Sequence, residues 1–553
     1  MRKAVLLALI VIPLALLARL LAAPPDRAEE EAMKRIRPES LRAHIRFLAD
    51  NSLEGRGTGT RGHELAAKYV AAQFEAMGLA PGGANGSYFQ PVPLRKVELV
   101  QEQSSLTILQ NGKEQAFSYG EDFLMRGDPL RTENTLESPV VLAGYGVTAP
   151  ELNYDDYAGT DVRGKIVVYL SGAPAKFPPT LRAYFSSGPV KAAAAASHGA
   201  IGMLQMLTLE DEKRQPWQFR VNQFRFPAIR WLDANGVPND ARPEIRGQAT
   251  LSRSGAEALF AGAPKSLDDV LASASAGQAS AFPLSATAKL RTVSRHTPLE
   301  SPNVLGMLHG SDPKLRDEYV VYTAHADHLG IGRPVDGDAI YNGMLDNASG
   351  TAALLEVARA FASLSRPPKR SVLFVVVTGE EAGLLGSDFF AHSPTVPLER
   401  IVANVNIDGI PGLYPLRDVV PFGAEHSSLG EVVRQSANRL ELEVSPDPMP
   451  EEVFFIRSDQ YSFVRQGVPA VFLTEGFKTG DPKLDGGALT RQWLQTRYHT
   501  PKDDVTQPFD YNPGAKFAQL NFLIGYQIAQ QSQRPTWNKG DFFGEKFGRN
   551  RKP

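Results

Sequence analysis

Three β-branched runs in the second half of the chain end in side chains that could bind a metal ion. Their sequences are "EYVVYTAHAD", "SVLFVVVTGEE" and "IVANVNID". Ligand sites in open α/β sheets form beyond the carboxyl ends of the strands, so we expect the side chains at these three ends to meet at one edge of a sheet. The side chains in question are His325, Asp327, Glu380, Glu381 and Asp408.

Two other segments offer polar side chains of the same kinds. The segment "YNGMLDNASG" places Asp346 just ahead of a predicted helix, and "RYHTPKDD" places Tyr498 and His499 in a predicted loop. Each candidate has an ordinary alternative when it is taken alone. Asp346 would commonly cap a helix, His325 would lie on the surface, and a Glu-Glu pair would start a solvated helix. The shared position at strand ends favours a metal site over these alternatives.

The candidates divide by chemistry into ligands and groups that assist hydrolysis. Glu380 is left free to act as a general base, which takes a proton from an activated water and returns it to the leaving nitrogen. Asp327 could accept a hydrogen bond from the second ring nitrogen of His325, and Tyr498 could donate to a developing oxyanion. The ligands suit two zinc ions that share one carboxylate, and they are His325, Asp346, Glu381, Asp408 and His499.

The remaining histidines fit this pattern less well. His328 follows Asp327 directly, and we interpret it as a structural residue or as one that supports a ligand. The others lie in no comparable cluster of polar residues, and we assign them no role. They are His44, His63, His198, His296, His309, His392 and His426.

The elements that must position these residues form an α/β pattern. Beyond Ser301, buried strands alternate with amphipathic helices such as Gly350 to Leu364, which predicts an α/β domain with a mostly parallel, helix-flanked sheet. Earlier in the chain, apolar spacing from Glu39 to Gly82 predicts two helices around "NSLEGRGTGTRG". This connector follows a helix and holds no phosphate-binding pattern, so we interpret it as a flexible turn.

The middle of the chain has a different character. From about residue 137 short strands and turns predict an inserted, small, β-rich domain, in which "KAAAAASHGAIGML" predicts a helix packed on a sheet. A Ser/Ala/Gly-rich stretch, "LASASAGQASAF", marks its end. The predicted division is 1–23 as a signal peptide or membrane anchor, 28–136 and 291–535 as the two parts of the α/β domain, 137–290 as the insertion, and 536–553 as a tail.

Composition narrows the classes of function. A chain of 553 residues is long enough for two or three domains. Its 59 Lys and Arg residues nearly balance its 61 Asp and Glu residues, so we expect no nucleic-acid partner. The absence of cysteine excludes disulfides, thiolate zinc sites and cysteine nucleophiles. Any metal must therefore be held by His, Asp and Glu.

The first residues, "MRKAVLLALIVIPLALLARLLAAPPD", predict an export signal, because two basic residues precede an apolar run. That run is shorter than the roughly 20 residues that span a bilayer. No clean small-residue cleavage site precedes Pro24, so an uncleaved membrane anchor stays an alternative. We expect an exported protein, periplasmic or secreted, that contacts a membrane only through such an anchor.

At its motifs the chain resembles the di-zinc aminopeptidase family that also contains glutamate carboxypeptidases and the transferrin receptor. The motifs are "HADH", "GMLDNASG", "GEEAGLLGS", "NIDG" and "YHTPKDD", in that order. The segments "VVLAGYG" and "NYDDYAGTDVRGKIVV" resemble a protease-associated domain inserted in such enzymes. The resemblance implies one zinc ion at His325 and Asp408, a second at Glu381 and His499, and Asp346 as the bridge between them.

The same resemblance implies roles for the other candidates. Glu380 would be the general base, Asp327 would orient His325, and Tyr498 would polarise the scissile carbonyl. A histidine of the family's "SDH" segment is replaced by Gln460 in "SDQYSF", and we expect this change to affect pocket shape more than metal binding. The leading hypothesis is an exported metallo-aminopeptidase that removes N-terminal residues from peptides with a free N-terminus, by a zinc-activated water.

Other functions of the same fold stay open. A glutamate carboxypeptidase would need an arginine-rich patch for the substrate's terminal carboxylate, and Arg457 and Arg465 are candidates that form no recognisable cluster. A glutaminyl cyclase would use a single zinc ion, and the inserted domain argues mildly against it. A non-catalytic receptor or binding module would be expected to lose ligands, whereas all five are present here.

Overall fold

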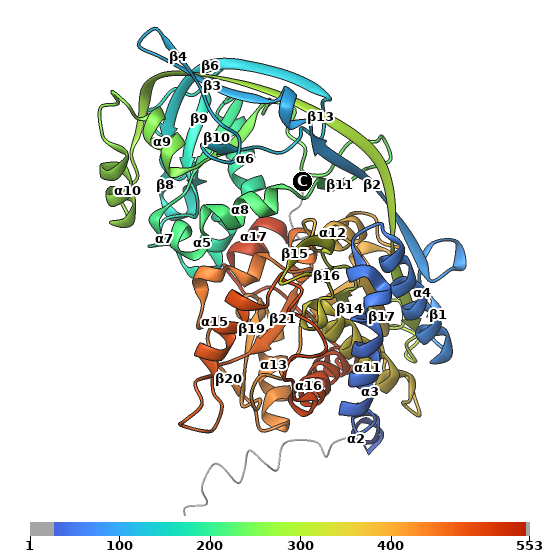
Figure 1. Ribbon diagram of the computed structural model, residues 1–553. Helices are drawn as coiled ribbons and strands as arrows, with labels where there is room; N and C mark the ends of the chain where they lie inside the picture. Colours follow the sequence, from blue (N-terminus) through green and yellow to red (C-terminus); the bar gives the residue numbers. More distant parts are fainter. Residues whose placement is uncertain (1–26, 549–553) are drawn as a thin grey trace, which may run out of the picture.

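The computed structural model describes residues 27–548 of the chain. The predicted signal peptide or anchor, residues 1–23, lies outside the described residues, as do the last five residues of the predicted tail. Within residues 27–548 no helix is long and apolar enough to cross a membrane. Figure 1 shows the chain folded around two sheets. The lower part holds the first helices, drawn in blue, and most of the second half of the chain, drawn from yellow to red, and the upper part holds the segments between them, drawn from blue through cyan to green.

The lower sheet is built around four parallel strands in the order β17, β14, β18, β21. The antiparallel strands β13 and β19 extend it on either side, and β2 and β11 follow β13. This mixed and largely parallel sheet confirms the predicted fold class. The central strands are β14 (Tyr319–His325), β17 (Ser371–Val377), β18 (Ile401–Asn406) and β21 (Ala470–Glu475), and the flanking ones β2 (Phe89–Leu99), β11 (Ala228–Trp231), β13 (Ala281–Leu308) and β19 (Asp418–Phe422).

Both faces of this sheet are covered by helices, because alternate residues of each central strand point to opposite faces. In β14, Val320 and Tyr322 pack into one buried cluster with several helices, whereas Val321 packs into another cluster with other helices. Runs that are apolar throughout are therefore buried on both sides. The helices include α3 (Pro38–Leu48), α11 (Gly350–Ala362) and α16 (Tyr511–Gln530) in the first cluster, and α12 (Leu385–His392) and α14 (Gln460–Arg465) in the second.

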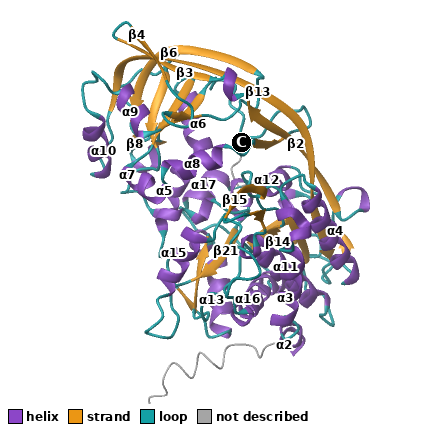
Figure 2. Ribbon diagram, in the orientation of Figure 1, coloured by secondary structure: helices purple, strands orange, loops and turns teal. Residues whose placement is uncertain are grey.

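The upper sheet is joined to the lower one by β13, a single strand of 28 residues (Figures 1 and 2). Its residues 281–293 pair with β3 and β6, and its residues 294–308 pair with β2 and β17. The predicted boundary at residue 290 thus falls inside one continuous strand. The upper strands are β3 (Ser105–Gln110), β4 (Lys113–Ala116), β5 (Phe123–Leu124), β6 (Glu133–Ala143), β9 (Ile166–Leu170), β10 (Gly202–Met206) and β12 (Gln248–Leu251).

Two local predictions can be compared with the structure directly. The helices expected between Glu39 and Gly82 are α3 and α4 (Arg61–Ala76), which confirms them. The alanine-rich segment forms a helix, α6 (Gly188–Ser197), but its predicted extension to Leu204 is wrong. Gly199 adopts a φ of 81°, which ends the helix, and β10 begins at Gly202. The likeness of the upper sheet to a protease-associated domain stays a prediction.

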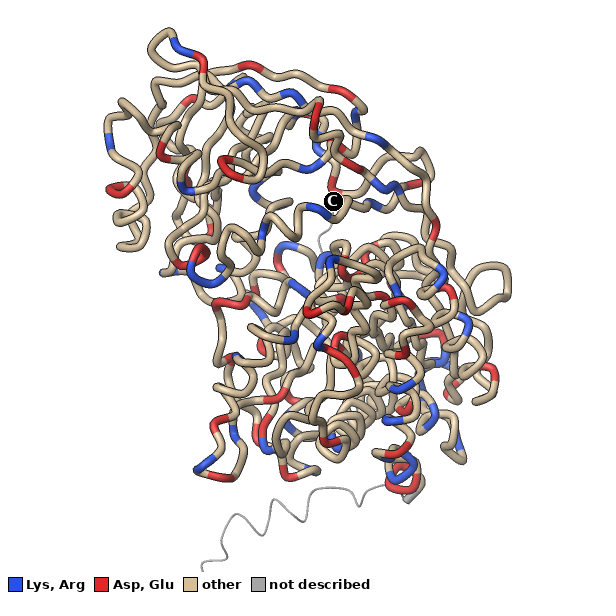
Figure 3. The backbone as a smooth tube through the Cα atoms, in the orientation of Figure 1, with Lys and Arg blue, Asp and Glu red and all other residues tan. Residues whose placement is uncertain are grey.

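Basic and acidic residues are interspersed over both parts of the molecule (Figure 3). Some of the ion pairs are short-range pairs on the surface, such as Lys68 with Glu64 and Arg253 with Glu257. Such exposed pairs contribute little to stability. The charges that matter for function are therefore those that are buried.

Candidate active site

Three side chains from separate elements meet at the carboxyl end of the central strands. His325 ends β14, Asp408 follows β18, and Asp346 lies in η5 (Met344–Ser349), the turn before α11. The Nε2 atom of His325 lies 3.2 Å from Asp408 Oδ1 and 3.4 Å from Asp346 Oδ1. These three residues could hold one metal ion.

The other oxygen of Asp346 belongs to a second group. Asp346 Oδ2 lies 3.2 Å from Nε2 of His499, which is also 3.0 Å from Glu381 Oε2. His328, Asp346 and Glu381 form a second candidate metal group. The Nδ1 atom of His328 lies 2.6 Å from Glu381 Oε1 and 3.9 Å from Asp346 Oδ2. Asp346 is therefore shared between two groups, as a bridging ligand would be.

The donors around these two positions fit zinc. Among the described residues, His328 Nδ1, His499 Nε2 and Glu381 Oε1 are buried without a hydrogen bond of proper geometry, although they lie close together. Buried polar atoms are ordinarily paired, so atoms that converge without pairing point to a missing partner. Imidazole nitrogens and carboxylate oxygens are donors that zinc accepts. The two positions therefore suit a pair of zinc ions held by nitrogen and oxygen alone.

Electrostatics support the same interpretation. Burial and the neighbouring Asp346 would raise the pKa of Glu381, but the histidines His499 and His328 outweigh them and lower it to about 2. Burial would lower the pKa of His499, but Glu381 and Asp346 raise it to about 10. Carboxylates that stay ionised in a buried site need cations to balance them.

The two carboxylates at the end of β17 have different surroundings. Glu381 faces the histidines, whereas Glu380 lines a cavity together with Asp346 and Asp408. Burial raises the pKa of Glu380 well above its ordinary value, and the Asp408 and Glu381 charges add to this effect. A carboxylate with a raised pKa is suited to accept and return a proton near neutral pH.

Asp327 supports His325, Glu380 and Glu381 through hydrogen bonds that involve backbone groups. Its carboxylate accepts hydrogen bonds from the backbone N–H of Glu380 at 3.1 Å and of Glu381 at 3.3 Å. The ring of His325 is held at Nδ1 by the carbonyl oxygen of Asp327, at 3.1 Å, while the nearer carboxylate oxygen is 3.7 Å away. The predicted contact between carboxylate and imidazole is thus replaced by one to the backbone. Asp327 orients His325 and the Glu380–Glu381 turn together.

Asp346 is positioned by a residue from the motif "YHTPKDD". The buried carboxylate of Asp503 accepts hydrogen bonds from the backbone N–H of Leu345 at 2.9 Å and of Asp346 at 3.0 Å. Asn347, which follows Asp346, caps α11 through a hydrogen bond from the N–H of Gly350. The capping role considered for Asp346 therefore falls to its neighbour, and the Asp346 carboxylate is free to face both metal positions.

The glycine-rich connector between α3 and α4 packs against the site. Arg56 is buried there, and its guanidinium donates hydrogen bonds to the carbonyls of Ala326, Leu48, Asn342 and Gly343. Two of these carbonyls belong to the segment that leads into η5. The prediction of a flexible turn is wrong, because Arg56 connects the connector to the segments that carry His325 and Asp346.

Behind Asp408 lies a buried hydrogen-bonded chain. Ser458 donates to Asp408 Oδ2 at 2.7 Å, and Asn406 donates to Ser458 Oγ at 2.7 Å and to Gln460 Oε1 at 3.2 Å. Gln460 in turn donates to the carbonyl of Phe455 at 2.8 Å. Gln460 does not line the cavity beside the metal positions, and its expected effect on pocket shape stays a prediction.

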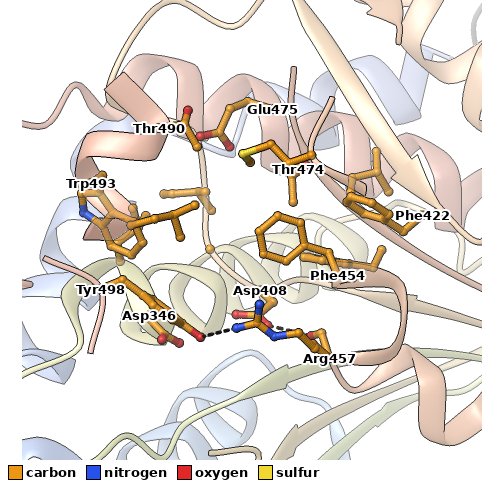
Figure 4. Close-up of a pocket in the computed structure, with 18 of the residues that line it drawn as sticks. Asp346, Asp408, Phe422, Phe454, Arg457, Thr474, Glu475, Thr490, Trp493 and Tyr498 are labelled. Atoms are coloured by element: carbon orange, nitrogen blue, oxygen red, sulfur yellow. Dashed lines mark hydrogen bonds between the residues drawn. The ribbon is translucent and has the colours of Figure 1, made fainter. Parts of the chain in front are cut away.

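Tyr498 lies at the rim of that cavity, across from Arg457 (Figure 4). Arg457 Nη2 donates to the Tyr498 hydroxyl at 3.2 Å. Burial raises the pKa of Tyr498 well above its ordinary value, although Arg457 opposes this effect. The hydroxyl therefore stays protonated, and its own hydrogen remains available to a substrate oxygen.

The structure brings together all five predicted ligands, Glu380, Asp327 and Tyr498. Arg56 and Asp503, which help to build the site, carried no assigned role in the sequence, and His328 was interpreted only as a structural residue or as one that supports a ligand. A signal existed for His328, which stands in the motif "HADH" beside two candidates, and for Asp503, which stands in "YHTPKDD". For Arg56 the composition of its segment pointed to a loop, and only the fold shows its four acceptors.

Two candidate metal positions that share an aspartate, beside a glutamate that belongs to neither, resemble the two-metal sites of enzymes such as phosphatases and aminopeptidases. Residues 303–522 match the family model described as "Peptidase family M28". The match covers the strands and loops that carry every residue of the two metal groups.

Two relatives are similar to this chain in sequence, and one solved structure is similar to it in fold. The aminopeptidase NAALADL1 of Mus musculus is 35% identical over 133 residues, which are 23% of this chain and 16% of that protein. A probable zinc metalloprotease of Pyricularia oryzae is 35% identical over 261 residues, 42% of this chain and 50% of that protein. The chain thus spans half or less of these relatives' length. The fold is similar to that of an aminopeptidase from Aneurinibacillus sp. strain AM-1, with a TM-score of 0.51 and 19% identity over 92% of this chain and 97% of that one.

Proposed function

We propose that the protein is a zinc-dependent aminopeptidase, which hydrolyses the first peptide bond of substrates that have a free N-terminus. The observation that carries the proposal is the position of Asp346 between two groups of ligands, with Glu380 beside them and facing a cavity. The names of the relatives support it, since they include an aminopeptidase and a zinc metalloprotease. His325, Asp346 and Asp408 would hold one zinc ion, and Asp346, Glu381, His499 and His328 the other.

Zinc, when bound, would polarise the scissile carbonyl and make a water molecule acidic enough to lose a proton. Glu380 accepts that proton and delivers it to the leaving nitrogen, which its raised pKa favours. Tyr498 donates a hydrogen bond to the oxygen on which negative charge develops, and Arg457 holds Tyr498 in place.

The arrangement of arginines favours an aminopeptidase over a carboxypeptidase. Arg457 is the only Lys or Arg among the described residues that line the cavity, and it is already paired with Glu452 and Tyr498. Arg465, the other candidate from the sequence, pairs with Asp240 and Asp388. A substrate's terminal carboxylate would therefore find no cluster of free cations here.

The experiment that tests the proposal compares aminoacyl anilides with their N-acetylated forms, using the zinc-loaded full chain with and without a chelator. We expect cleavage of the free amines alone, and loss of cleavage with the chelator. Equal cleavage of the acetylated forms would contradict an aminopeptidase. Cleavage that survives complete removal of metal would contradict the role of zinc.

We also propose export, on the basis of the basic and apolar residues between Arg2 and Ala18. Fractionation of cells that express the full chain tests this proposal. Recovery in the periplasm, in the medium or on the outer side of the membrane is expected, whereas recovery only in the cytoplasm would contradict it.

A further inference from the structure

Glu475 ends the fourth of the central parallel strands. β21 pairs with β18 so that Phe472 lies opposite Asn406, and Glu475 and Asp408 both lie at the carboxyl edge of the sheet. Glu475 lines the same cavity as the metal cluster. In Figure 4 it lies beside Thr490, on the side of the cavity away from Asp346 and Asp408. The cavity therefore has an acidic group at its far end as well as at the metal cluster.

The walls between these two ends are mainly apolar. The cavity has a volume of about 160 Å³. Aromatic and aliphatic side chains separate Glu475 from the cluster, and Figure 4 shows Phe454 and Trp493 on opposite sides. The walls include Ile410, Leu413, Met449, Phe454, Phe472 and Trp493. Walls of this kind accommodate a chain of methylene groups.

Among residues 27–548, the Glu475 carboxylate is paired only with its own backbone N–H. No hydrogen bond or ion pair joins it to another described side chain. The hydroxyl of Thr490, beside Glu475 in Figure 4, donates to the Gly486 carbonyl at 3.0 Å, and the hydroxyl of Tyr414 donates to the Gly476 carbonyl at 3.0 Å. Burial raises the pKa of Glu475, and the nearby Asp418 adds to this effect. A carboxylate in such surroundings gains most from a cation that enters the cavity.

In an aminopeptidase the amine and the scissile carbonyl lie at the metal cluster, so the first side chain of the substrate must extend into the adjoining cavity. We propose that this cavity selects N-terminal lysine and arginine, with the methylene stem between the apolar walls and the cationic head paired with Glu475. This inference rests on the proposed aminopeptidase function. It assigns to Glu475 a role in specificity and none in the bond-breaking step.

The test uses three anilides that all carry a free α-amine: lysine, Nε-acetyl-lysine and leucine. The acetylated side chain keeps the stem and removes the charge. With the zinc-loaded full chain we expect kcat/KM for lysine to exceed that for Nε-acetyl-lysine by about tenfold or more, as one charge-assisted hydrogen bond would produce. Glu475→Gln should reduce this ratio to near one and leave kcat/KM for leucine within about twofold, which also shows that the variant is folded.

Asp447→Asn is the matched control, because Asp447 also lines the cavity but accepts a hydrogen bond from the N–H of Met449. We expect it to keep the preference for lysine. Cleavage of leucine with no preference for lysine, or a preference that survives Glu475→Gln, would overturn the inference and leave the proposed function standing. Failure to cleave any of the three substrates would instead overturn the proposed function, and the inference with it.

Discussion

His328 Nδ1 lies 2.6 Å from Oε1 of Glu381, and both atoms are buried. The ring of His328 is held on its other side by Gly343, where a Cβ atom would come within 2.5 Å of the ring. Gly343 has a φ of 58°, which glycine adopts without strain. The imidazole is thus fixed between a glycine and a metal ligand. In this position His328 could serve as a fourth donor to a second metal ion, beside Asp346, Glu381 and His499, or could support Glu381.

His328→Ala should weaken the binding of one metal ion and leave the other in place. Loss of a ligand or of a residue that holds one typically costs about 10- to 100-fold in metal affinity. Titration of the metal-free protein with zinc, followed by calorimetry, measures both sites. His309→Ala is the control, since His309 is exposed. Two unchanged affinities in His328→Ala would show that His328 is neither a ligand nor a support for one.

Glu380→Gln should keep both metal ions and lose most of the activity. The substitution removes the proton acceptor without changing the shape of the side chain, and general-base catalysis typically contributes about 10²- to 10⁴-fold to the rate. Metal content by elemental analysis and kcat on a leucine anilide are the two measurements. Asp346→Ala is the contrasting variant, because it should lose metal as well as activity. An active Glu380→Gln protein would assign the base to another residue.

Tyr498→Phe should lower kcat and leave KM nearly unchanged. The hydroxyl is held by Arg457 and is expected to donate only as charge develops on the substrate oxygen. Removal of one such donor typically costs about 10²- to 10³-fold in kcat. Steady-state kinetics on one anilide separate the two constants. A rise in KM with kcat preserved would mean that Tyr498 only binds the substrate.

Arg56→Met should reduce the stability of the fold. The substitution keeps the length of the side chain but leaves four carbonyls without their donor, and each buried polar group left unpaired costs about 1–3 kcal/mol. Urea denaturation measures the change in the free energy of unfolding. Arg61→Met is the control, since the Arg61 side chain is 68% exposed. Equal stability of the two variants would show that water replaces the Arg56 contacts at no cost.

The sequence predicts the central strands of the lower sheet well, but it does not predict how the two sheets are connected. Runs such as "SVLFVVVTGEE" are buried on both faces, so their composition alone identifies strands, and the order of strands and helices places Glu380 and Asp408 at one edge. The strand β13 is different. Its residues 281–293 and 294–308 pair with strands of two different sheets, and no local pattern shows that one strand serves both.

Several contacts in the site also form only because the fold brings distant segments of the chain together. Arg56 lies in a segment rich in glycine, and its acceptors come from positions 8 to 287 residues away in the chain. Asp503 acts through the backbone of Leu345 and Asp346, which no side-chain motif records. Sequence patterns identify which residues can bind a metal, whereas the contacts that aim those residues arise only when distant segments pack together.

We propose that hydrolysis depends on two metal ions bound at the Asp346 cluster. The most direct measurement is a titration of the metal-free full chain with zinc, in which cleavage of a leucine anilide and bound zinc are followed together. We expect activity to reach its plateau when about two zinc ions are bound per chain, as the two candidate metal groups require. Full activity without bound metal, or two bound zinc ions with no cleavage of any free aminoacyl anilide, would contradict the account.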